Sequence, residues 1–245
     1  MSASSSKVSL YTSCYEKDWK HILVDGGIEN KIAKDKHNYD NKVLLLKHDP
    51  SGELDGEIRE HAEKKKEEGI IDDFQVVEEY SSEILKHFKL TKEQMGESYP
   101  YSIHEMAAIM LCQTEFMVYY TSDSILADND FDWVAEGIKA MQQYKIIYSV
   151  CPWWGGPDGR NKSPYELWQE KNYFVEYGCL SDRVFLLRPE TWRGIDMEAK
   201  DPESAKRYPK YAGAYLFERV ADSWTRQIDK ARATVDKLVY LHPCC

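Results

Sequence analysis

An aspartate in a short polar segment is the residue best placed to do chemistry. Asp123 lies in the string Thr121-Ser122-Asp123-Ser124, directly after the apolar run 116–120 (FMVYY). The run predicts a buried strand, so the carboxylate comes at a strand end. Mg²⁺ and Mn²⁺ prefer oxygen ligands and commonly bridge one or two carboxylates to a diphosphate. Asp123 is therefore a candidate metal ligand, although an aspartate after a strand also suits a turn or a helix cap.

The elements that must position this aspartate alternate along the chain. Strands are predicted at residues 8–14, 42–47, 74–77, 116–120, 144–151, 184–187 and 238–241. Helices are predicted at residues 19–33, 54–68, 81–88, 103–112, 131–143 and 214–237. This alternation favours a single α/β domain with a mainly parallel sheet and helices on both faces. Ligands bind such sheets beyond the carboxyl ends of the strands.

Polar clusters and helix caps add detail to this arrangement. Besides the Asp123 segment, polar residues follow the strand at 8–14, and the aromatic segment 152–159 (PWWGGPDG) follows the strand at 144–151. Its prolines and glycines predict a loop. Ser81 or Ser82 is predicted to cap one helix. Ser102 is predicted to cap the next, with Glu105 completing a capping box.

Composition excludes several classes of function. The net charge of -10 argues against a nucleic-acid partner, because such binders need a basic face. The chain contains no GxxxxGK[ST], GxGxxG, GxSxG or HExxH motif. The chain has 17 tyrosines and 7 tryptophans. Those that do not pack in the core suit flat ligands such as bases and sugar faces.

Cysteine usage and terminal segments bear on location. The six cysteines form no CxxC pair, which is typical of free thiols in a reducing compartment. No signal peptide or membrane-spanning segment is predicted. The expected location is the cytoplasm, or the host cytoplasm if the chain is viral. The terminal pair Cys244-Cys245 resembles a prenylation site, which leaves peripheral membrane contact open, but a frayed end is the favoured interpretation.

The ordered set of segments resembles the GT-A glycosyltransferases, in particular a bacterial and viral branch that acts on surface or capsid glycans. VSLYTSCYEKD is similar to their opening strand and nucleotide-facing turn, and FMVYYTSDSIL to the strand that carries their Asp-x-Asp metal motif. GCLSDRVFLL, RYPKYAGAYLFER and LVYLHP resemble acceptor-side elements and a closing strand with its histidine. Here the acidic motif reads Thr121-Ser122-Asp123, so the first of its two acidic residues is missing.

The resemblance implies a role for each candidate residue. A donor half would span residues 1–128, and an acceptor half would span residues 129–245. The expected donor-binding residues are Thr12, Ser13, Tyr15, Asp49, Thr121 and Ser122. Asp123 and His242 would hold Mn²⁺ or Mg²⁺, and Trp153, Trp154 and Gly155 would contact the sugar or the acceptor. Each of these positions also has an ordinary structural interpretation, as a turn, core or surface residue.

Two carboxylates are candidates for the catalytic base. An inverting transfer needs a group that deprotonates the acceptor hydroxyl as it attacks the sugar. Asp182 precedes a predicted strand, and Glu218 lies near a helix start, whose dipole favours an ionised carboxylate. Asp182 is the preferred base and Glu218 the preferred binder of hydroxyls. The structural alternative for each is an ion pair with the adjacent Arg183 or Arg219.

The predicted function is transfer of a hexosyl or pentosyl group from a UDP- or GDP-sugar to a glycan or glycoprotein. Two alternatives stay open. A sugar-phosphate nucleotidyltransferase uses a similar sheet and metal, but normally has a glycine-rich basic loop after its first strand. A catalytically inactive sugar- or nucleotide-binding module would explain the incomplete acidic motif. The sequence gives no indication of oligomeric state.

Overall fold

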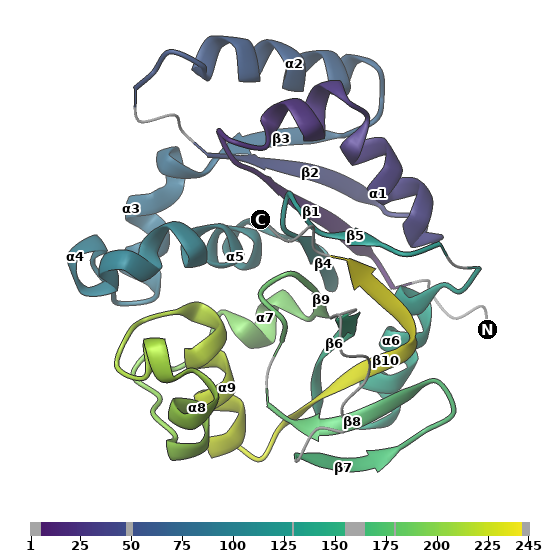
Figure 1. Ribbon diagram of the computed structural model, residues 1–245, viewed down its shortest axis with the longest axis vertical. Coiled ribbons are helices and arrows are strands. Elements are labelled where there is room, and N and C mark those ends of the chain that lie inside the picture. Colours follow the sequence, from purple (N-terminus) through teal and green to yellow (C-terminus); the bar gives the residue numbers. More distant parts are fainter. Residues whose placement is uncertain (1–5, 48–50, 129, 155–164, 179, 242–245) are drawn as a thin grey trace.

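The computed structural model describes residues 6–47, 51–128, 130–154, 165–178 and 180–241. Within these residues, ten strands form one sheet in the order β3-β2-β1-β4-β9-β6-β10-β8-β7, and β5 pairs with β10 (Figure 1). The strands are β1 Val8–Cys14, β2 Asn41–Leu46, β3 Asp73–Val76, β4 Phe116–Tyr120, β5 Ile125–Leu126, β6 Ile147–Trp154, β7 Glu166–Gln169, β8 Tyr173–Tyr177, β9 Val184–Leu187 and β10 Ala231–Leu241.

Most strands run in one direction, which confirms the predicted α/β class with a mixed, mainly parallel sheet. β3, β2, β1 and β4 are parallel neighbours, and β10 is parallel to β6. β9 lies between β4 and β6 and runs antiparallel to both. This reversal brings the start of β9 to the same edge of the sheet as the ends of β1, β4 and β6.

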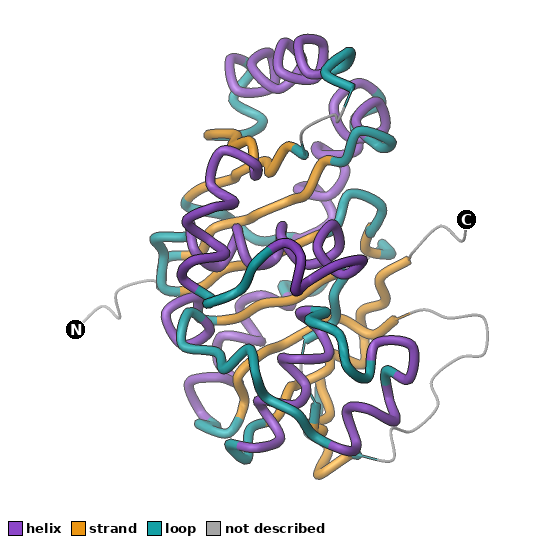
Figure 2. Tube along the Cα trace, turned by 90° about the vertical axis from the view of Figure 1, so that its left-hand side faces the viewer, coloured by secondary structure: helices purple, strands orange, loops and turns teal. Residues whose placement is uncertain are grey.

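Helices cover both faces of the sheet (Figures 1 and 2). The longer helices are α1 Gly27–Asp35, α2 Asp55–Glu67, α3 Val77–His87, α5 Tyr99–Leu111, α6 Trp133–Gln143 and α9 Phe217–Gln227. The short ones are η1 Lys20–Val24, α4 Lys92–Met95, η2 Gly96–Ser98, α7 Pro189–Trp192, α8 Pro202–Arg207 and η3 Pro209–Tyr211. None of the described helices combines the length and apolar composition needed to span a bilayer.

Alternation along the strands divides the core between the two faces. On β4, Met117 and Tyr119 pack in one core with α3, α5 and α9, whereas Val118 and Tyr120 pack in another with α6. A third core lies under η1, α1 and α2. Successive side chains of a strand point to opposite faces, so an all-apolar strand such as β4 has to be covered on both.

A buried aspartate links three elements on the α6 side. Asp35, at the end of α1, accepts hydrogen bonds from the Tyr120 hydroxyl at 2.5 Å and from Trp133 Nε1 at 2.7 Å. The Tyr39 hydroxyl also donates to it. Burial raises the pKa of Asp35, although the three donors act in the opposite direction. These bonds hold α1 and α6 against the end of β4, the strand that precedes Asp123.

Two of the predicted helix starts are wrong. α3 begins at Val77 and α5 at Tyr99, so Ser81 and Ser82 lie inside α3 and Ser102 and Glu105 inside α5. Pro100 lies in the first turn of α5, where its missing N–H costs nothing. Ser102 is buried and accepts a hydrogen bond from the backbone N–H of Phe217 at 2.9 Å, so it links α5 to α9 instead of capping a helix.

Two longer predictions need correction as well. Residues 214–237 were expected to be mostly helical, but α9 ends at Gln227 and β10 starts at Ala231. The strand forms because this segment pairs with both β6 and β8. Residues 152–154 were predicted as part of a loop, but Pro152 pairs with Val235 and β6 continues to Trp154, while residues 155–159 of that prediction lie outside the described residues. Both corrections share one cause, the β6–β10 pairing.

Candidate functional site

Asp123 lies in the turn between β4 and β5, and the turn is held by hydrogen bonds. The Thr121 hydroxyl donates to Asp123 Oδ1 at 2.8 Å, and its oxygen lies 2.7 Å from the Ser124 hydroxyl. The Ser122 N–H donates to Ser13 Oγ at 3.0 Å, and the Ser122 hydroxyl donates to Asp18. The Asp123 side chain stays 31% exposed. The turn therefore presents a carboxylate at the edge of the sheet.

Lys31 fastens this turn to α1. The side chain is buried, and its ammonium donates to the carbonyl of Thr121 at 3.1 Å and to the carbonyl of Ser124. Burial lowers the pKa of Lys31 to about 7, while the charges of Asp123, Asp35 and Asp18 act in the opposite direction. Sequence reasoning missed this lysine, which lies 90 residues from Thr121 along the chain.

Arg183 joins two of the predicted acidic residues. Its Nη1 lies 3.3 Å from Asp123 Oδ2, and its Nε lies 3.5 Å from Asp182 Oδ1. The Thr121 N–H donates to the Arg183 carbonyl at 2.8 Å, so the start of β9 lies beside the Asp123 turn. The structural alternative for Asp182, an ion pair with Arg183, is present. Because Arg183 contacts both carboxylates, Asp182 and Asp123 lie beside the same guanidinium group.

Glu218 belongs to the same cluster of charges. It lies in the first turn of α9, as predicted. Burial raises its pKa to about 8, and the negative charge of Asp182 adds to this shift. The guanidinium groups of Arg207 and Arg232 act in the opposite direction. Glu218 therefore carries a proton at neutral pH, which sets it apart from the ionised base that the helix dipole suggested.

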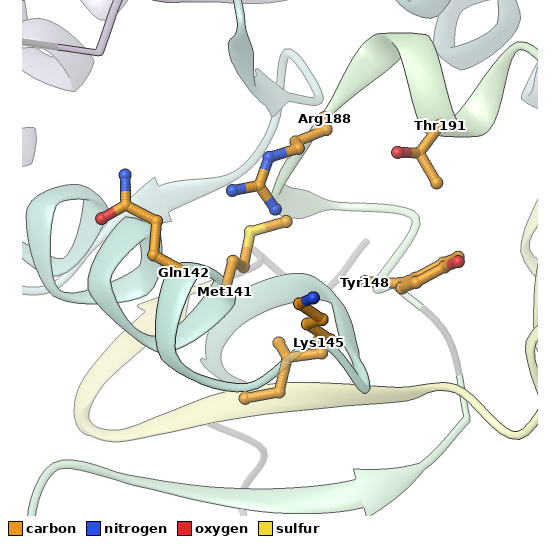
Figure 3. A pocket seen from close by; sticks show the side chains of 7 residues that line it. Met141, Gln142, Lys145, Tyr148, Arg188 and Thr191 are labelled. Carbon is orange, nitrogen blue, oxygen red and sulfur yellow. The ribbon is translucent and has the colours of Figure 1, made fainter.

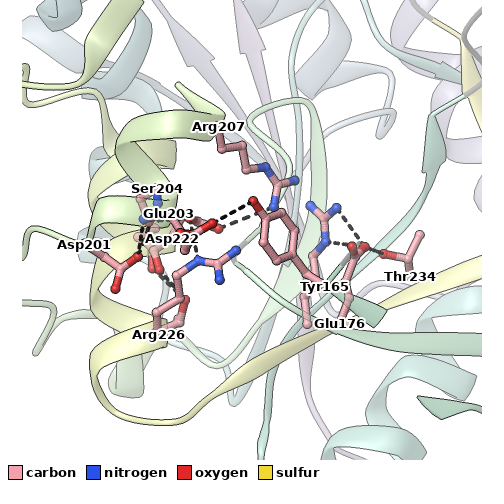
Figure 4. A network of polar contacts seen from close by, with 12 residues as sticks. Tyr165, Glu176, Asp201, Glu203, Ser204, Arg207, Asp222, Arg226 and Thr234 are labelled. Carbon is pink, nitrogen blue, oxygen red and sulfur yellow. Dashed lines mark hydrogen bonds and ion pairs between the residues drawn. The ribbon is translucent and has the colours of Figure 1, made fainter. Parts of the chain in front are cut away.

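Two networks of polar contacts hold the arginines near Glu218 (Figure 4). In one, the buried Asp222 accepts hydrogen bonds from Arg226 Nε at 3.0 Å and Arg207 Nη1 at 3.4 Å, and also from Ser204. Gly178, beside this network, has a φ of 125°, which favours glycine, and a Cβ there would also lie 2.8 Å from Asp222 Oδ1.

The second network lies on β8 and β10. Glu176 accepts hydrogen bonds from Arg232 Nε at 2.9 Å and from the Thr234 hydroxyl at 3.0 Å. Glu176 and Thr234 are buried. The buried Glu176 carboxylate thus holds Arg232 in place. Arg207 and Arg232, the two arginines that lower the pKa of Glu218, therefore both have defined positions.

Glu105 is a fourth carboxylate of this region, although the sequence predicted it as part of a helix cap. It is buried on α5, and its Oε2 has no hydrogen-bond partner among the described residues. Burial raises its pKa, and the charges of Asp182 and Glu218 add to the effect. The electrostatic influence of Asp182 on both glutamates shows that the three carboxyl groups face a common region.

The predicted base-binding segment forms a second part of the edge. Tyr15 is half-buried, with its ring 4.6 Å from the ring of His104 and the Lys47 ammonium 5.4 Å from its centroid. Thr12 and Ser13 are buried in β1, and Ser13 Oγ is used by the Ser122 N–H. Tyr15 is therefore the member of this segment with an exposed surface beside the strand end.

The remaining predicted residues are placed less completely. The ring of Trp153 packs edge-on against Phe174 with centroids 5.9 Å apart, and Trp154 is the last residue of β6. Asp49, Gly155 and His242 lie outside the described residues. The described backbone ends at Leu241, which pairs with Ile125, two residues after Asp123.

The described side chains around Asp123 include few further ligands for a divalent ion. Within the described residues, no three His, Cys, Asp or Glu side chains gather as a metal-binding group. Mg²⁺ bound with a nucleotide commonly uses one or two carboxylates together with phosphate oxygens and waters. The half-exposed carboxylate of Asp123 fits that pattern as a single ligand, provided that Arg183 moves away from it.

His104 gives a testable pH dependence of stability. It is buried, neither ring nitrogen has a hydrogen-bond partner among the described residues, and burial together with Lys47 lowers its pKa to about 3. An unfolded histidine has a pKa near 6.5. Between about pH 6.5 and pH 3, His104 is therefore protonated in the unfolded chain and neutral in the folded chain. Stability is therefore lost as the pH falls through this window.

Replacing His104 with phenylalanine removes the titration and keeps an aromatic ring against Tyr15. Chemical denaturation at pH 7 and pH 5 should show that the wild type loses about 2 kcal/mol more than His104→Phe over this interval. Replacement of the exposed His21 with phenylalanine is the matched control and should keep the wild-type difference. An unchanged slope in His104→Phe would refute this assignment.

No protein-family model matches the sequence, and no curated protein matches it. Solved structures do match. GalNAc-T7 with UDP, GalNAc and Mn²⁺ is 12% identical with a TM-score of 0.60, over 97% of this chain and 44% of that one. Glucosyl-3-phosphoglycerate synthase from Mycobacterium tuberculosis, with Mn²⁺, UDP and phosphoglyceric acid, is 12% identical with a TM-score of 0.52, over 98% and 72%.

A UDP-glucose pyrophosphorylase complexed with UDP-glucose is also similar, 9% identical with a TM-score of 0.52, over 94% of this chain and 90% of that one. At such low identity these matches establish the fold, which is of the GT-A type. The chain spans less than half the length of GalNAc-T7 and about three quarters of the synthase.

Proposed function

We propose that this protein is a glycosyltransferase that moves a hexosyl or pentosyl group from a UDP- or GDP-sugar to a glycan or glycoprotein, assisted by Mn²⁺ or Mg²⁺. The observation that carries the proposal is the cluster of Asp123, Asp182 and Glu218 around Arg183 at the carboxyl edge of a GT-A sheet. Ligands of open α/β sheets bind at that edge. The similar structures that contain UDP and Mn²⁺ support it.

The donor would bind over the first half of the chain. The base would stack on Tyr15, with Thr12, Ser13 and Asp49 near the base and ribose. Thr121 and Ser122 shape the turn that carries Asp123, as their hydrogen bonds indicate. Asp123 would hold the metal, which neutralises charge on the diphosphate leaving group when bound. Arg183, freed from Asp123, would pair with a phosphate oxygen.

His242 is the proposed second metal ligand. The residue before it, Leu241, is opposite Ile125 in the β5–β10 pair, so the described chain ends beside the Asp123 turn. Imidazole is an acceptable ligand for manganese. This proximity in the backbone supports the pairing of Asp123 with His242.

The acceptor would approach over residues 129–245. Trp153, Trp154 and Gly155 would contact the sugar or the acceptor near the end of β6. Asp182 would take the proton from the acceptor hydroxyl as that oxygen attacks the anomeric carbon. Glu218 would donate a hydrogen bond from its protonated carboxyl group to a sugar hydroxyl. The strands β3, β2, β1 and β4 of the donor half lie together in the sheet, and β5 of the same half pairs with β10.

A thermal-shift measurement tests the donor site. UDP or GDP at about 100 times its Kd, with Mn²⁺, should stabilise the protein by about 2.7 kcal/mol. For a chain of this size that raises the Tm by about 5–10 °C. With EDTA in place of Mn²⁺ the shift should be much smaller, because no cation would then screen the repulsion between the diphosphate and the Asp123 carboxylate. Equal shifts in the two conditions would rule out metal bridging, and no shift with either nucleotide would rule out the donor site.

A nucleotidyltransferase is the second candidate, and the UDP-glucose pyrophosphorylase match favours it. The two reactions release different products. A glycosyltransferase given a nucleotide-sugar and an acceptor releases a nucleoside diphosphate, whereas a nucleotidyltransferase given a nucleoside triphosphate and a sugar 1-phosphate releases pyrophosphate. An inactive binding module would show the thermal shift with a nucleotide-sugar and release neither product.

A further inference from the structure

A cavity of about 330 Å³ lies away from the edge that carries Asp123. It is lined by Met141, Gln142, Lys145, Ile147, Tyr148, Arg188 and Thr191. Ile147 is the first residue of β6, and Arg188 follows the last residue of β9. Arg183 precedes β9, so Arg183 and Arg188 lie at opposite ends of that strand, about 16 Å apart at the usual rise of a strand. A ligand in this cavity does not touch the proposed donor or acceptor sites.

The cavity combines an apolar floor with cationic walls. Met141 and Ile147 are buried, and the ring of Tyr148 lies to one side. Figure 3 shows Arg188 above Met141 and Lys145, with Gln142 on one side and Tyr148 and Thr191 on the other. Its volume is within the range of sites that hold small organic molecules.

The two cations that line the cavity differ in how their charge is compensated. The Lys145 ammonium makes no hydrogen bond or ion pair with any described residue, and the carboxylate of Glu115 is 3.9 Å from Arg188 Nε. A third cation, Lys230, donates to the Lys145 carbonyl at 3.4 Å and lies 5.0 Å from the centroid of the Tyr148 ring. Lys230 does not line the cavity, so Lys145 and Arg188 supply its positive charge in a protein whose net charge is -10.

An anion in the cavity would give the Lys145 ammonium a partner of opposite charge. Ammonium and guanidinium groups are the usual protein partners of phosphate oxygens. Gln142 and Thr191 add neutral donors, and the floor of Met141 and Ile147 with the Tyr148 ring suits a flat apolar group. We propose that this cavity, the Lys145–Arg188 pocket, binds a small molecule that carries a phosphoryl group on an aromatic or otherwise apolar body.

Phenyl phosphate is a suitable probe, because it has both parts of this chemistry. In a titration followed by amide chemical shifts, the amides of Tyr148 and Thr191 should move together and saturate. Lys145→Gln and Arg188→Gln should each raise the Kd about tenfold or more, since each removes a charged hydrogen bond. Lys139→Gln is the matched control, because Lys139 is exposed on α6 outside the pocket and should leave the Kd unchanged.

The outcomes separate this proposal from the proposed function. Inorganic phosphate should bind more weakly than phenyl phosphate, and phenol should not bind. Unmoved Tyr148 and Thr191 amides, or a Kd that Lys145→Gln leaves unchanged, would overturn the pocket. Equal affinity for inorganic phosphate would overturn the apolar part of the ligand class. The nucleotide-dependent thermal shift should be the same in Lys145→Gln as in the wild type, whatever becomes of the pocket.

Discussion

Replacing Asp123 with asparagine should lower the rate of sugar transfer at least ~10²-fold and remove the Mn²⁺-dependent part of nucleotide affinity. The asparagine keeps the shape of the side chain and can still accept the hydrogen bond from Thr121. What it loses is the negative charge that would hold a divalent ion. The Tm should change little, because the carboxylate is half-exposed and contributes little packing.

A nearby carboxylate provides the control for this variant. Asp128 lies five residues further along the same connection, its side chain is 94% exposed, and it pairs with Lys34. Asp128→Asn should therefore leave transfer and nucleotide affinity unchanged. The measurements are initial rates and nucleotide titrations, with and without Mn²⁺. Near-normal turnover of Asp123→Asn would place the metal site elsewhere.

Asp182→Asn should lower kcat by ~10²–10⁴-fold, the usual contribution of a positioned base. Donor affinity should stay near the wild-type value, because Asp123 and the β1 edge hold the donor. Glu218→Gln should leave kcat nearly unchanged at neutral pH and alter the acceptor KM only modestly. The pKa of Glu218 is raised to about 8, so at neutral pH the wild-type side chain is already uncharged, and glutamine is a close substitute for it.

The pH profile distinguishes the two roles further. Glu218 loses its proton as the pH rises through about 8, so wild-type transfer should decline above that pH, and Glu218→Gln should not show the decline. Glu190→Gln is a control, because that side chain is 89% exposed on α7. A large fall in kcat for Glu218→Gln with a mild Asp182→Asn would exchange the two roles. Two mild variants would point to a retaining mechanism or to another base, and Glu105 would then be the next residue to test.

The strands were predictable because their signal is local. Runs such as FMVYY at 116–120 and VFLL at 184–187 are apolar at every position, and a strand buried on both faces needs no other pattern. Segment 231–237 failed for the opposite reason. Its Arg232, Thr234 and Asp236 break the apolar run, and it becomes a strand because β6 and β8 pair with it on either side.

Helix starts also depended on distant contacts. Ser102 matches the sequence pattern of a cap, but the structure uses its hydroxyl to accept the Phe217 N–H, 115 residues away. Glu105 matches the second position of the capping-box pattern, but in the structure it is buried beside the acidic cluster. A capping pattern reports what a serine can do locally, and tertiary packing decides whether the helix begins there.

By itself, the sequence determined the fold class and the position of Asp123 at a strand end, because hydrophobic runs and the turns after them are encoded by neighbouring residues. Tertiary structure alone decided which charges meet Asp123. Arg183 lies 60 residues from Asp123 along the chain, and Lys31 lies 90 residues from Thr121. The reversal of β9 between β4 and β6 brings Arg183 and Asp182 to the same edge, and burial there changes which carboxyl groups keep their protons. The meeting of these charges and the changed protonation both depend on packing between distant segments, which a local sequence pattern cannot predict.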